Sequence, residues 1–141
     1  MNADLIVSDL KHDEGWRAEP YQDHLGFWTI GYGFLIDGRK SVRLPQEVGE
    51  FWLNFLVGER IKALNDALPW LSAQPDDVQR ALVGMAYQMG VAGVLKFEKA
   101  LDALKAGNRL LAANEALDST WAKQTPERAS RVAAMIRGVP T

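Results

Sequence analysis

The stretch from Asp13 to Leu35 constrains the fold of this chain more than any other part of the sequence. Over residues 17–36 it is too rich in glycine, proline and aromatic residues for a helix, and it predicts a small antiparallel sheet. Gly31 and Gly33 lie within a strand-like segment, where glycine often marks a close approach of backbone or ligand. The following pair, Asp37-Gly38, predicts a hairpin-type turn.

The rest of the chain has helical patterns. Helices are predicted over residues 3–14, 46–68, 75–90, 95–104 and 110–117, and from Pro126 to near Gly138 with Thr125 as N-cap. The helix over 46–68 carries two apolar stripes, so we expect it to be buried on two sides as a connector between two lobes. This order of elements predicts an α+β fold.

Composition narrows the class of protein. A length of 141 residues fits one domain. The net charge is −2, so the chain as a whole lacks the excess of positive charge that nucleic-acid-binding domains use. The absence of cysteine excludes disulfides and thiolate metal sites. The N-terminal apolar run is only Leu5-Ile6-Val7, too short for a signal peptide or a membrane span. We therefore expect synthesis in the cytoplasm and no membrane insertion.

Three polar residues of the first stretch could share one groove. Glu14 ends the first predicted helix, Asp23 lies in a turn, and Thr29 begins a strand. Acids in such places are usually only solvated. In the functional interpretation they carry out glycoside hydrolysis, which needs one carboxylic acid for the leaving oxygen and a second group for water or the sugar cation.

Other polar residues give weaker signals. His12 and His24, even with neighbouring aspartates, do not form a metal-binding pattern, so we expect no metal site and no cofactor. Arg128 and Arg131 lie three apart on one predicted helix face, which is usually a solvated edge.

Three segments together point to a known family. They are Glu14-Gly15 with Tyr21-Gln22-Asp23 and Thr29-Ile30-Gly31-Tyr32-Gly33, then Met85-Ala86-Tyr87-Gln88-Met89-Gly90, and finally the run from Trp121 to Arg131. In this order they resemble the tailed-phage lysozymes, glycoside hydrolase family 24. The resemblance covers most of the chain.

The resemblance implies a fold and an activity. The fold would be a single lysozyme-like α+β domain over 1–141, with a sheet lobe at about 13–45, a connecting helix at 46–68, and a helical lobe at 69–141 that includes the N-terminal helix. The activity would be that of an endolysin, which cleaves the β-1,4 bond between N-acetylmuramic acid and N-acetylglucosamine in peptidoglycan with inversion. A monomer without a cofactor would reach the wall after a holin opens the membrane.

The resemblance also assigns roles to residues. Glu14 matches the general acid, Asp23 the second carboxylate, and Thr29 the hydroxyl that helps to hold water. Positions that match the sugar-binding cleft are Gly33, Leu35, Tyr87 and Gln88. Arg128 matches an arginine that pairs with Glu14, and Arg131 with Asp13 would form a supporting pair.

The sequence also departs from the family pattern. Phe34 stands where the best-known members carry a histidine, Tyr87 replaces a phenylalanine, and Ala100 and Glu115 replace polar cleft residues. The segment between Leu35 and Pro45 is shorter, so we expect a trimmed sheet lobe.

Two other classes of function remain open. A lytic transglycosylase would use Glu14 alone and form a 1,6-anhydro sugar, a route that does not need Asp23 with Thr29. A non-catalytic wall-binding domain would keep the groove but would have no use for Glu14 with a partner arginine.

Overall fold

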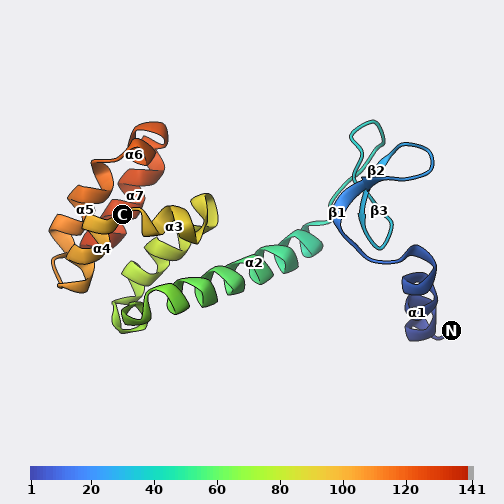
Figure 1. Ribbon diagram of the computed structural model, residues 1–141, viewed down its shortest axis with the longest axis horizontal. Coiled ribbons are helices and arrows are strands. Elements are labelled where there is room, and N and C mark those ends of the chain that lie inside the picture. Colours follow the sequence, from blue (N-terminus) through green and yellow to red (C-terminus); the bar gives the residue numbers. More distant parts are fainter. Residues whose placement is uncertain (140–141) are drawn as a thin grey trace. The chain divides into compact units, whose positions relative to one another are not determined.

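The structure is a computed structural model that describes residues 1–139 (Figure 1). The chain divides into two compact units, a first unit of Met1–Val48 and a second unit that begins at Gly49. The first unit contains helix α1 (Ala3–Glu14) and strands β1 (Arg17–Gln22), β2 (Trp28–Gly31) and β3 (Phe34–Leu35). Helix α2 (Gln46–Ala67) begins at the end of the first unit and continues into the second.

Helix α1 has the predicted bounds because both of its ends are satisfied locally. The Asn2 side chain accepts a hydrogen bond from the Leu5 N–H at 3.1 Å, as an N-cap residue does. At the other end Gly15 adopts a φ of 69°, and its N–H donates to the Lys11 carbonyl at 3.0 Å. Glu14 is therefore held at the last position of the helix.

The three strands form an antiparallel sheet in the order β1-β2-β3, which confirms the predicted sheet. Thr29 of the central strand faces Tyr21 on one side and Leu35 on the other. The register of β1 shifts between Arg17 and Tyr21, across Pro20, which has no N–H to give to a ladder. The turn after Asp37 is closed by a hydrogen bond from the Lys40 N–H to the Asp37 carbonyl. No fourth strand follows over residues 41–45.

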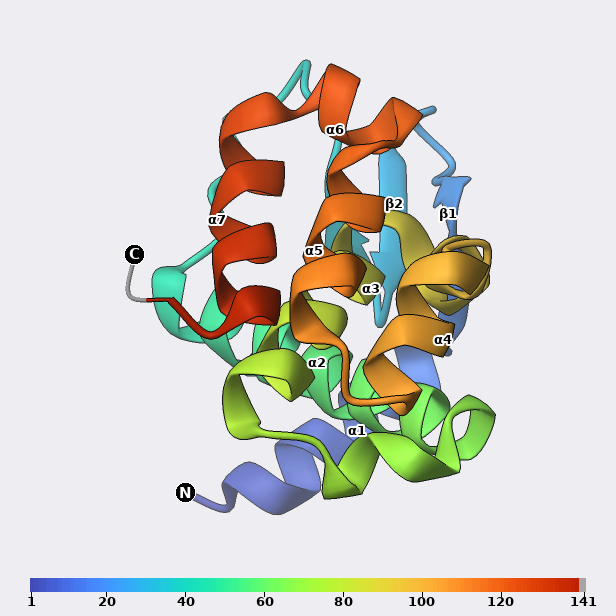
Figure 2. The same cartoon turned by 90° about the vertical axis from the view of Figure 1, so that its left-hand side faces the viewer.

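The second unit is helical. After α2 it contains the 3-10 helix η1 (Pro69–Ala73) and helices α3 (Asp76–Leu95), α4 (Glu98–Lys105), α5 (Arg109–Leu117), α6 (Thr120–Gln124) and α7 (Pro126–Arg137). The backbone of α3 leaves helical geometry at Gly90, with φ 79° and ψ 161°, where the sequence predicted an end. Helix α5 packs against both α4 and α7 (Figure 2).

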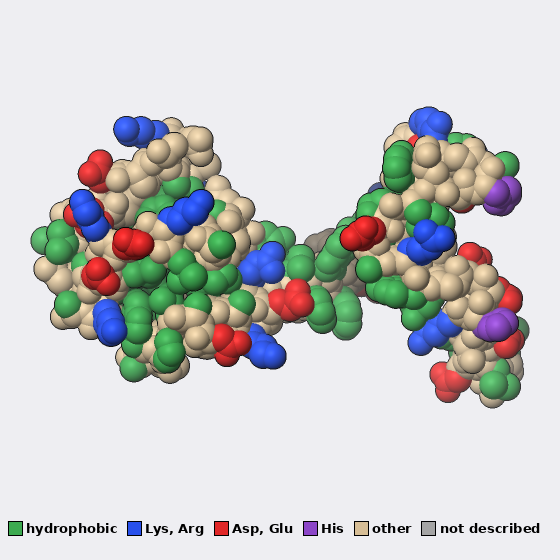
Figure 3. Space-filling view, viewed as in Figure 1, with side chains coloured by type: hydrophobic (Ala, Val, Ile, Leu, Met, Phe, Trp, Pro, Cys, Tyr) green, Lys and Arg blue, Asp and Glu red, His purple; other side chains and the backbone are tan. Residues whose placement is uncertain are grey.

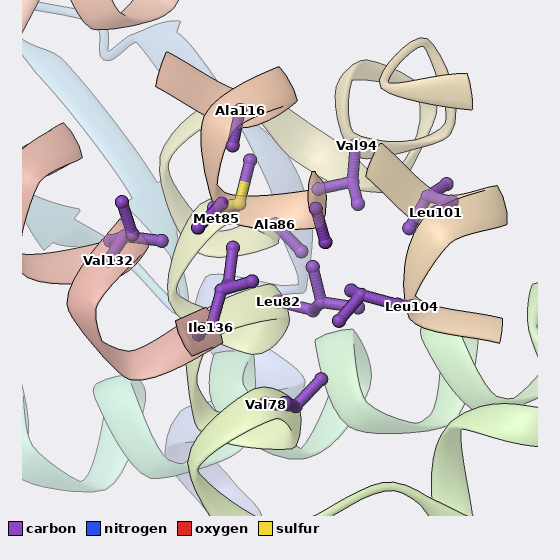
Figure 4. Close-up of a cluster of buried hydrophobic side chains, with 14 of the residues drawn as sticks. Val78, Leu82, Met85, Ala86, Val94, Leu101, Leu104, Ala116, Val132 and Ile136 are labelled. Atoms are coloured by element: carbon purple, nitrogen blue, oxygen red, sulfur yellow. The ribbon is translucent and has the colours of Figure 1, made fainter. Parts of the chain in front are cut away.

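The core of the second unit is made of apolar side chains from α3, α4, α5 and α7 (Figure 4). In α3 the apolar residues Val78, Leu82 and Met85, which recur at intervals of four and three, are buried. In α7 Val132 and Ile136, four residues apart, are also buried. On the face of the helical unit seen in Figure 3, cationic and anionic side chains are interspersed.

The predictions for α2 and for the start of α7 have different outcomes. Leu64, near the end of α2, is buried in the core of the second unit, while Phe51 and Phe55 are exposed. The expected burial of this helix on two sides, as a connector between lobes, stays a prediction. Thr125 does not cap α7 with its side chain. Its hydroxyl donates to the Trp121 carbonyl at 3.0 Å, since the end of the short helix α6 leaves that carbonyl available.

Arg109 joins three helices at one end of the second unit. Its Nε donates to the Ile136 carbonyl at 2.7 Å, and its Nη2 donates to the Met135 carbonyl at 2.9 Å and to Asp77 Oδ2 at 2.8 Å. The hydrogen bond from Arg109 lowers the pKa of Asp77. Gly138 caps α7 in the left-handed region, and a Cβ there would lie 2.9 Å from the guanidinium. The cation therefore satisfies carbonyls that the end of α7 leaves open.

No helix among the described residues is both long and apolar enough to cross a membrane.

Candidate active site

The Glu14 carboxylate lies against the backbone of Gly33. A Cβ added to Gly33 would lie 2.5 Å from Glu14 Oε2 and 2.9 Å from its Cδ, closer than real Cβ atoms come to another atom. Gly33 also has a φ of 73°, which disfavours every residue with a side chain. Position 33 therefore needs glycine for two reasons, and one of them is the carboxylate of Glu14.

Asp23 is fixed by the turn that joins β1 to β2. Its Oδ1 accepts hydrogen bonds from the N–H groups of Leu25 and Phe27, both at 2.9 Å. The turn is closed further by the bond from the Asp23 N–H to the Phe27 carbonyl, and by the bond from the Gly26 N–H to the Asp23 carbonyl. Among the described residues no group donates to Oδ2 of Asp23, so this oxygen remains an open acceptor.

Thr29 is buried at the centre of the sheet, with 4% of its surface exposed. Its hydroxyl donates to the Phe27 carbonyl at 3.0 Å. A hydroxyl has a single proton to donate and two lone pairs. Because that proton is engaged, Thr29 can act toward a ligand or a water only as an acceptor.

Asp37 and Arg39 form a pair that the sequence analysis did not single out. Arg39 donates to Asp37 through Nε at 2.9 Å and through Nη2 at 2.7 Å. Asp37 Oδ2 also accepts the Trp28 N–H at 2.8 Å, and Arg39 Nη2 reaches the Gly26 carbonyl at 2.6 Å. The Arg39 guanidinium, with the Trp28 and Arg39 N–H groups, holds the pKa of the Asp37 carboxyl well below its usual range. The Asp-Gly turn signal was visible in the sequence, but the partners of its carboxylate were not.

Phe34 occupies a place on the sheet that suits an aromatic ring. A Cβ on Gly31 would lie 2.7 Å from the Phe34 ring, so the ring covers that glycine directly. The ring also packs edge-on against Tyr32, with centroids 6.2 Å apart, and Tyr32 packs in turn against Trp16 at 5.0 Å. Phe34 thus belongs to an aromatic cluster on the first unit rather than to an ion pair.

In the second unit, Gln88 is held by a tryptophan. Trp121 Nε1 donates to Gln88 Oε1 at 3.0 Å, and Trp121 is packed edge-on against Phe97. Gln88 and its neighbour Tyr87 are exposed. Trp121 also lines a pocket of about 510 Å³, together with Phe97, Ala100 and Glu115. Ala100 and Glu115, two of the residues that depart from the family pattern, thus share a pocket with Trp121.

The arginines of α7 have different surroundings. Arg128 is partly buried, and its Nη2 donates to the Gly84 carbonyl at 3.0 Å. Arg131 is exposed, as is Asp13 in the first unit. The pairing of Arg128 with Glu14, and of Arg131 with Asp13, stays a prediction.

The structure thus groups some of the expected site residues. Glu14 with Gly33, and Thr29 with Leu35, are neighbours within the first unit, and the turn that fixes Asp23 ends at Phe27, whose carbonyl holds Thr29. Over residues 1–139, no group of three or more His, Asp or Glu side chains is arranged to hold a metal ion.

Comparison with known proteins identifies the family. The phage lysozyme family model matches residues 11–137. A relative from Dictyostelium discoideum, "Probable T4-type lysozyme 1", is 30% identical over an alignment 157 positions long, which covers 93% of this chain and 92% of that protein. "Probable T4-type lysozyme 2" of the same organism is 29% identical, with coverages of 87% and 88%. The "Pre-baseplate central spike protein Gp5" of Enterobacteria phage T4 is 34% identical over 90% of this chain, which spans 26% of that longer protein. The chain therefore belongs to the phage lysozyme family.

Proposed function

We propose that this protein hydrolyses the β-1,4 bond between N-acetylmuramic acid and N-acetylglucosamine in peptidoglycan, with inversion at the anomeric carbon, as an endolysin. Membership of the phage lysozyme family supports a lysozyme-like peptidoglycan hydrolase. In this proposal Glu14 is the general acid, while Asp23 and Thr29 hold the attacking water. Access to the wall through a holin and a monomeric state stay predictions.

The observation that carries the proposal is the hydrogen bonding of Asp23 and Thr29. Oδ1 of Asp23 is engaged by two backbone N–H groups, which leaves Oδ2 to take a proton. The proton of the Thr29 hydroxyl is engaged by Phe27, which leaves its oxygen as an acceptor. A water between them would donate one proton to Asp23 and the other to Thr29. Its lone pair would then point toward the sugar, as a nucleophile requires.

Glu14 suits the role of the acid because it is placed by two independent restraints. The end of α1 fixes the backbone of Glu14. The Glu14 carboxylate packs directly against the backbone of Gly33, which has no side chain to separate them. The carboxyl proton would pass to the glycosidic oxygen as the bond to the anomeric carbon breaks, which leaves Glu14 ionised.

The two acids are held near opposite ends of β2. Glu14 contacts Gly33, beyond one end of the strand, and the turn that holds Asp23 leads into the other end. A strand of four residues is about 10 Å long at roughly 3.3 Å per residue. Inverting glycosidases separate their carboxyl groups by about 6.5–9.5 Å, and retaining ones by only about 5–5.5 Å. The proposed inversion requires the carboxyl groups of Glu14 and Asp23 to be separated by the larger of these two distances.

Sugar recognition would use residues around these groups. Leu35 lies beside Thr29 in the sheet, and Gly33 would present its backbone next to Glu14. In the second unit the exposed Tyr87 and the Gln88 amide, whose oxygen is held by Trp121, would contact the glycan.

The first test replaces the acid. Glu14→Gln should lower the rate of muropeptide release from purified sacculi by about 10²- to 10⁴-fold, because the amide has no proton to give to the leaving oxygen. Binding to sacculi and the urea midpoint should stay as in the wild type. Glu19→Gln is the matched control, since Glu19 is an exposed glutamate of β1 in the same unit. An unchanged rate in Glu14→Gln would remove Glu14 from the mechanism.

The second part of the test identifies the product. Proton NMR of the first products should show the α-anomer at the new reducing end. The β-anomer alone would refute inversion, a 1,6-anhydro sugar would identify a lytic transglycosylase, and binding without release would identify a wall-binding domain.

A further inference from the structure

We propose that Asp37 and Arg39 position the Asp23 carboxylate and the Thr29 hydroxyl for attack of water, by tying the turn of residues 23–27 to the end of the sheet. The inference rests on the proposed function and extends it to two residues outside the catalytic motif. Neither residue would touch the substrate.

The two residues continue the sheet beyond its last strand. Strand β3 ends at Leu35, and the Ile36 N–H still donates to the Trp28 carbonyl at 2.9 Å. The next acceptor is not a backbone carbonyl but the Asp37 carboxylate, which takes the Trp28 N–H at 2.8 Å. Trp28 precedes Thr29 directly, so Asp37 fixes the backbone that carries the hydroxyl.

Arg39 links Asp37 to the turn of residues 23–27 by hydrogen bonds. Its two donors hold both oxygens of Asp37, and its Nη2 also donates to the carbonyl of Gly26. Gly26 is inside the turn whose N–H groups hold Asp23 Oδ1. The chain of hydrogen bonds therefore runs from Asp23 through the turn, Arg39 and Asp37 to the residue before Thr29.

Burial and charge make this pair costly to disturb. Only 3% of Asp37 is exposed, and a carboxylate in that setting needs a cation and several donors. The Asp37 carboxylate raises the pKa of Arg39, and the charge of Asp23 adds to this effect. Arg39 thus attracts Asp23 as well as holding its turn, while most of its own side chain is exposed.

Lys40 provides a matched comparison. Arg39 and Lys40 both place their cation over the Phe27 ring, at 5.0 Å and 4.5 Å from the centroid. Of these two side chains, only that of Arg39 donates hydrogen bonds to the turn and to the Asp37 carboxylate, while Lys40 contacts Asp37 through its backbone N–H. Replacing either residue with methionine removes one charge above the same ring, but only one of the two changes removes the support.

The experiment compares Arg39→Met, Arg39→Lys and Lys40→Met in the full chain. Steady-state rates on soluble glycan strands give kcat and KM, and amide hydrogen exchange is followed at Leu25, Phe27 and Trp28. For Arg39→Met we expect kcat to fall about 10- to 100-fold with KM within about twofold, as a misplaced catalytic group does. Exchange at the three amides should rise. Arg39→Lys should behave similarly because one ammonium cannot make the bidentate contact, whereas Lys40→Met should match the wild type.

Several results would overturn the proposal. Wild-type kcat in Arg39→Met, an equal loss of kcat in Lys40→Met, or a loss without faster exchange would each exclude positioning by Arg39. If Arg39→Met lowers the urea midpoint, Asp37→Asn is used to test the Asp37–Arg39 pair. This variant keeps the shape of the side chain and one hydrogen-bond acceptor. If the wild type releases no product, the proposed function fails, and the exchange rates still decide whether Arg39 holds the turn.

Discussion

The interactions that stabilise the inside of the first unit differ in kind from those inside the second unit. In the second unit the buried residues are hydrophobic side chains from Leu64 onward, and they form one cluster. In the first unit, the described side chains that are buried are polar, namely Thr29 and Asp37. Apolar packing is non-directional and tolerates adjustment, whereas hydrogen bonds fix orientation. A unit ordered by a few directed bonds is suited to hold reacting groups at set angles.

The difference predicts that stability and activity separate along the chain. Substitutions in the second unit should act mainly on the free energy of unfolding. Substitutions in the polar network of the first unit should act mainly on the rate of hydrolysis. The following variants test this separation.

Leu104→Ala should have the largest effect on stability. Leu104 is 1% exposed within the apolar cluster, and removing a buried leucine side chain costs about 2–5 kcal/mol, since a cavity remains. Urea denaturation measures the loss, and kcat per folded molecule should be unchanged. The control is Leu110→Ala, at an exposed site, which should stay within about 0.5 kcal/mol. Equal losses in the two variants would contradict the assigned core.

Gly33→Ala should lower activity more than stability. The new methyl group must displace the Glu14 carboxylate, so kcat should fall by about 10- to 100-fold. Gly107→Ala is matched for backbone strain, because Gly107 has a φ of 83° and open space where its Cβ would lie. Both variants should lose about 1–2 kcal/mol of stability for the left-handed conformation. Normal kcat in Gly33→Ala would show that this glycine does not seat the acid.

Asp77→Asn should give the smallest effect, and one that depends on pH. The pKa of Asp77 is lowered in the folded protein by Arg109, so the charged pair stabilises the fold above the unfolded pKa of about 3.9 and loses this contribution as the pH falls through the folded value. Because both side chains are partly exposed, we expect a loss of at most about 1 kcal/mol at pH 7, shrinking toward zero well below pH 4.

Asp76→Asn is the control for this effect. Asp76 is also in the first turn of α3, so it shares the favourable interaction with the helix N-terminus but has no ion pair with Arg109. Urea midpoints of both variants at pH 7 and pH 3 separate the two contributions. A loss in Asp77→Asn that is the same at both pH values would mean that the ion pair contributes nothing.

The sequence predicted those parts of the fold that depend on neighbouring residues. The ends of α1 and α7 follow from Gly15 and Gly138, and the break in α3 follows from Gly90. Helix α6 was not predicted because five residues are too few to show a helical period. Thr125 was assigned to the wrong bond because a threonine before Pro126 signals a cap, while the competing Trp121 carbonyl becomes visible only in the structure.

The candidate site was predictable where it coincides with a motif. Glu14, Asp23 and Thr29 were found through a resemblance, since acids at such spacings are usually only solvated. Asp37 was recognised as a turn residue, but its bond to Trp28 depends on the register of β2 and β3, which no local pattern encodes. The contact of Gly33 with Glu14 likewise joins residues 19 positions apart in the sequence.

The two bonds to Oδ1 of Asp23 have a consequence for an amide at that position. Asparagine could keep the turn only by placing its carbonyl oxygen toward the Leu25 and Phe27 N–H groups. Its NH₂ group would then occupy the place of Oδ2 and would donate a hydrogen bond where the proposed mechanism needs an acceptor. The turn itself would thus select the inactive orientation of the amide, and the protein would keep the surface that binds glycan. Under the proposed function, an enzyme changed in this way would capture peptidoglycan strands without cleaving them.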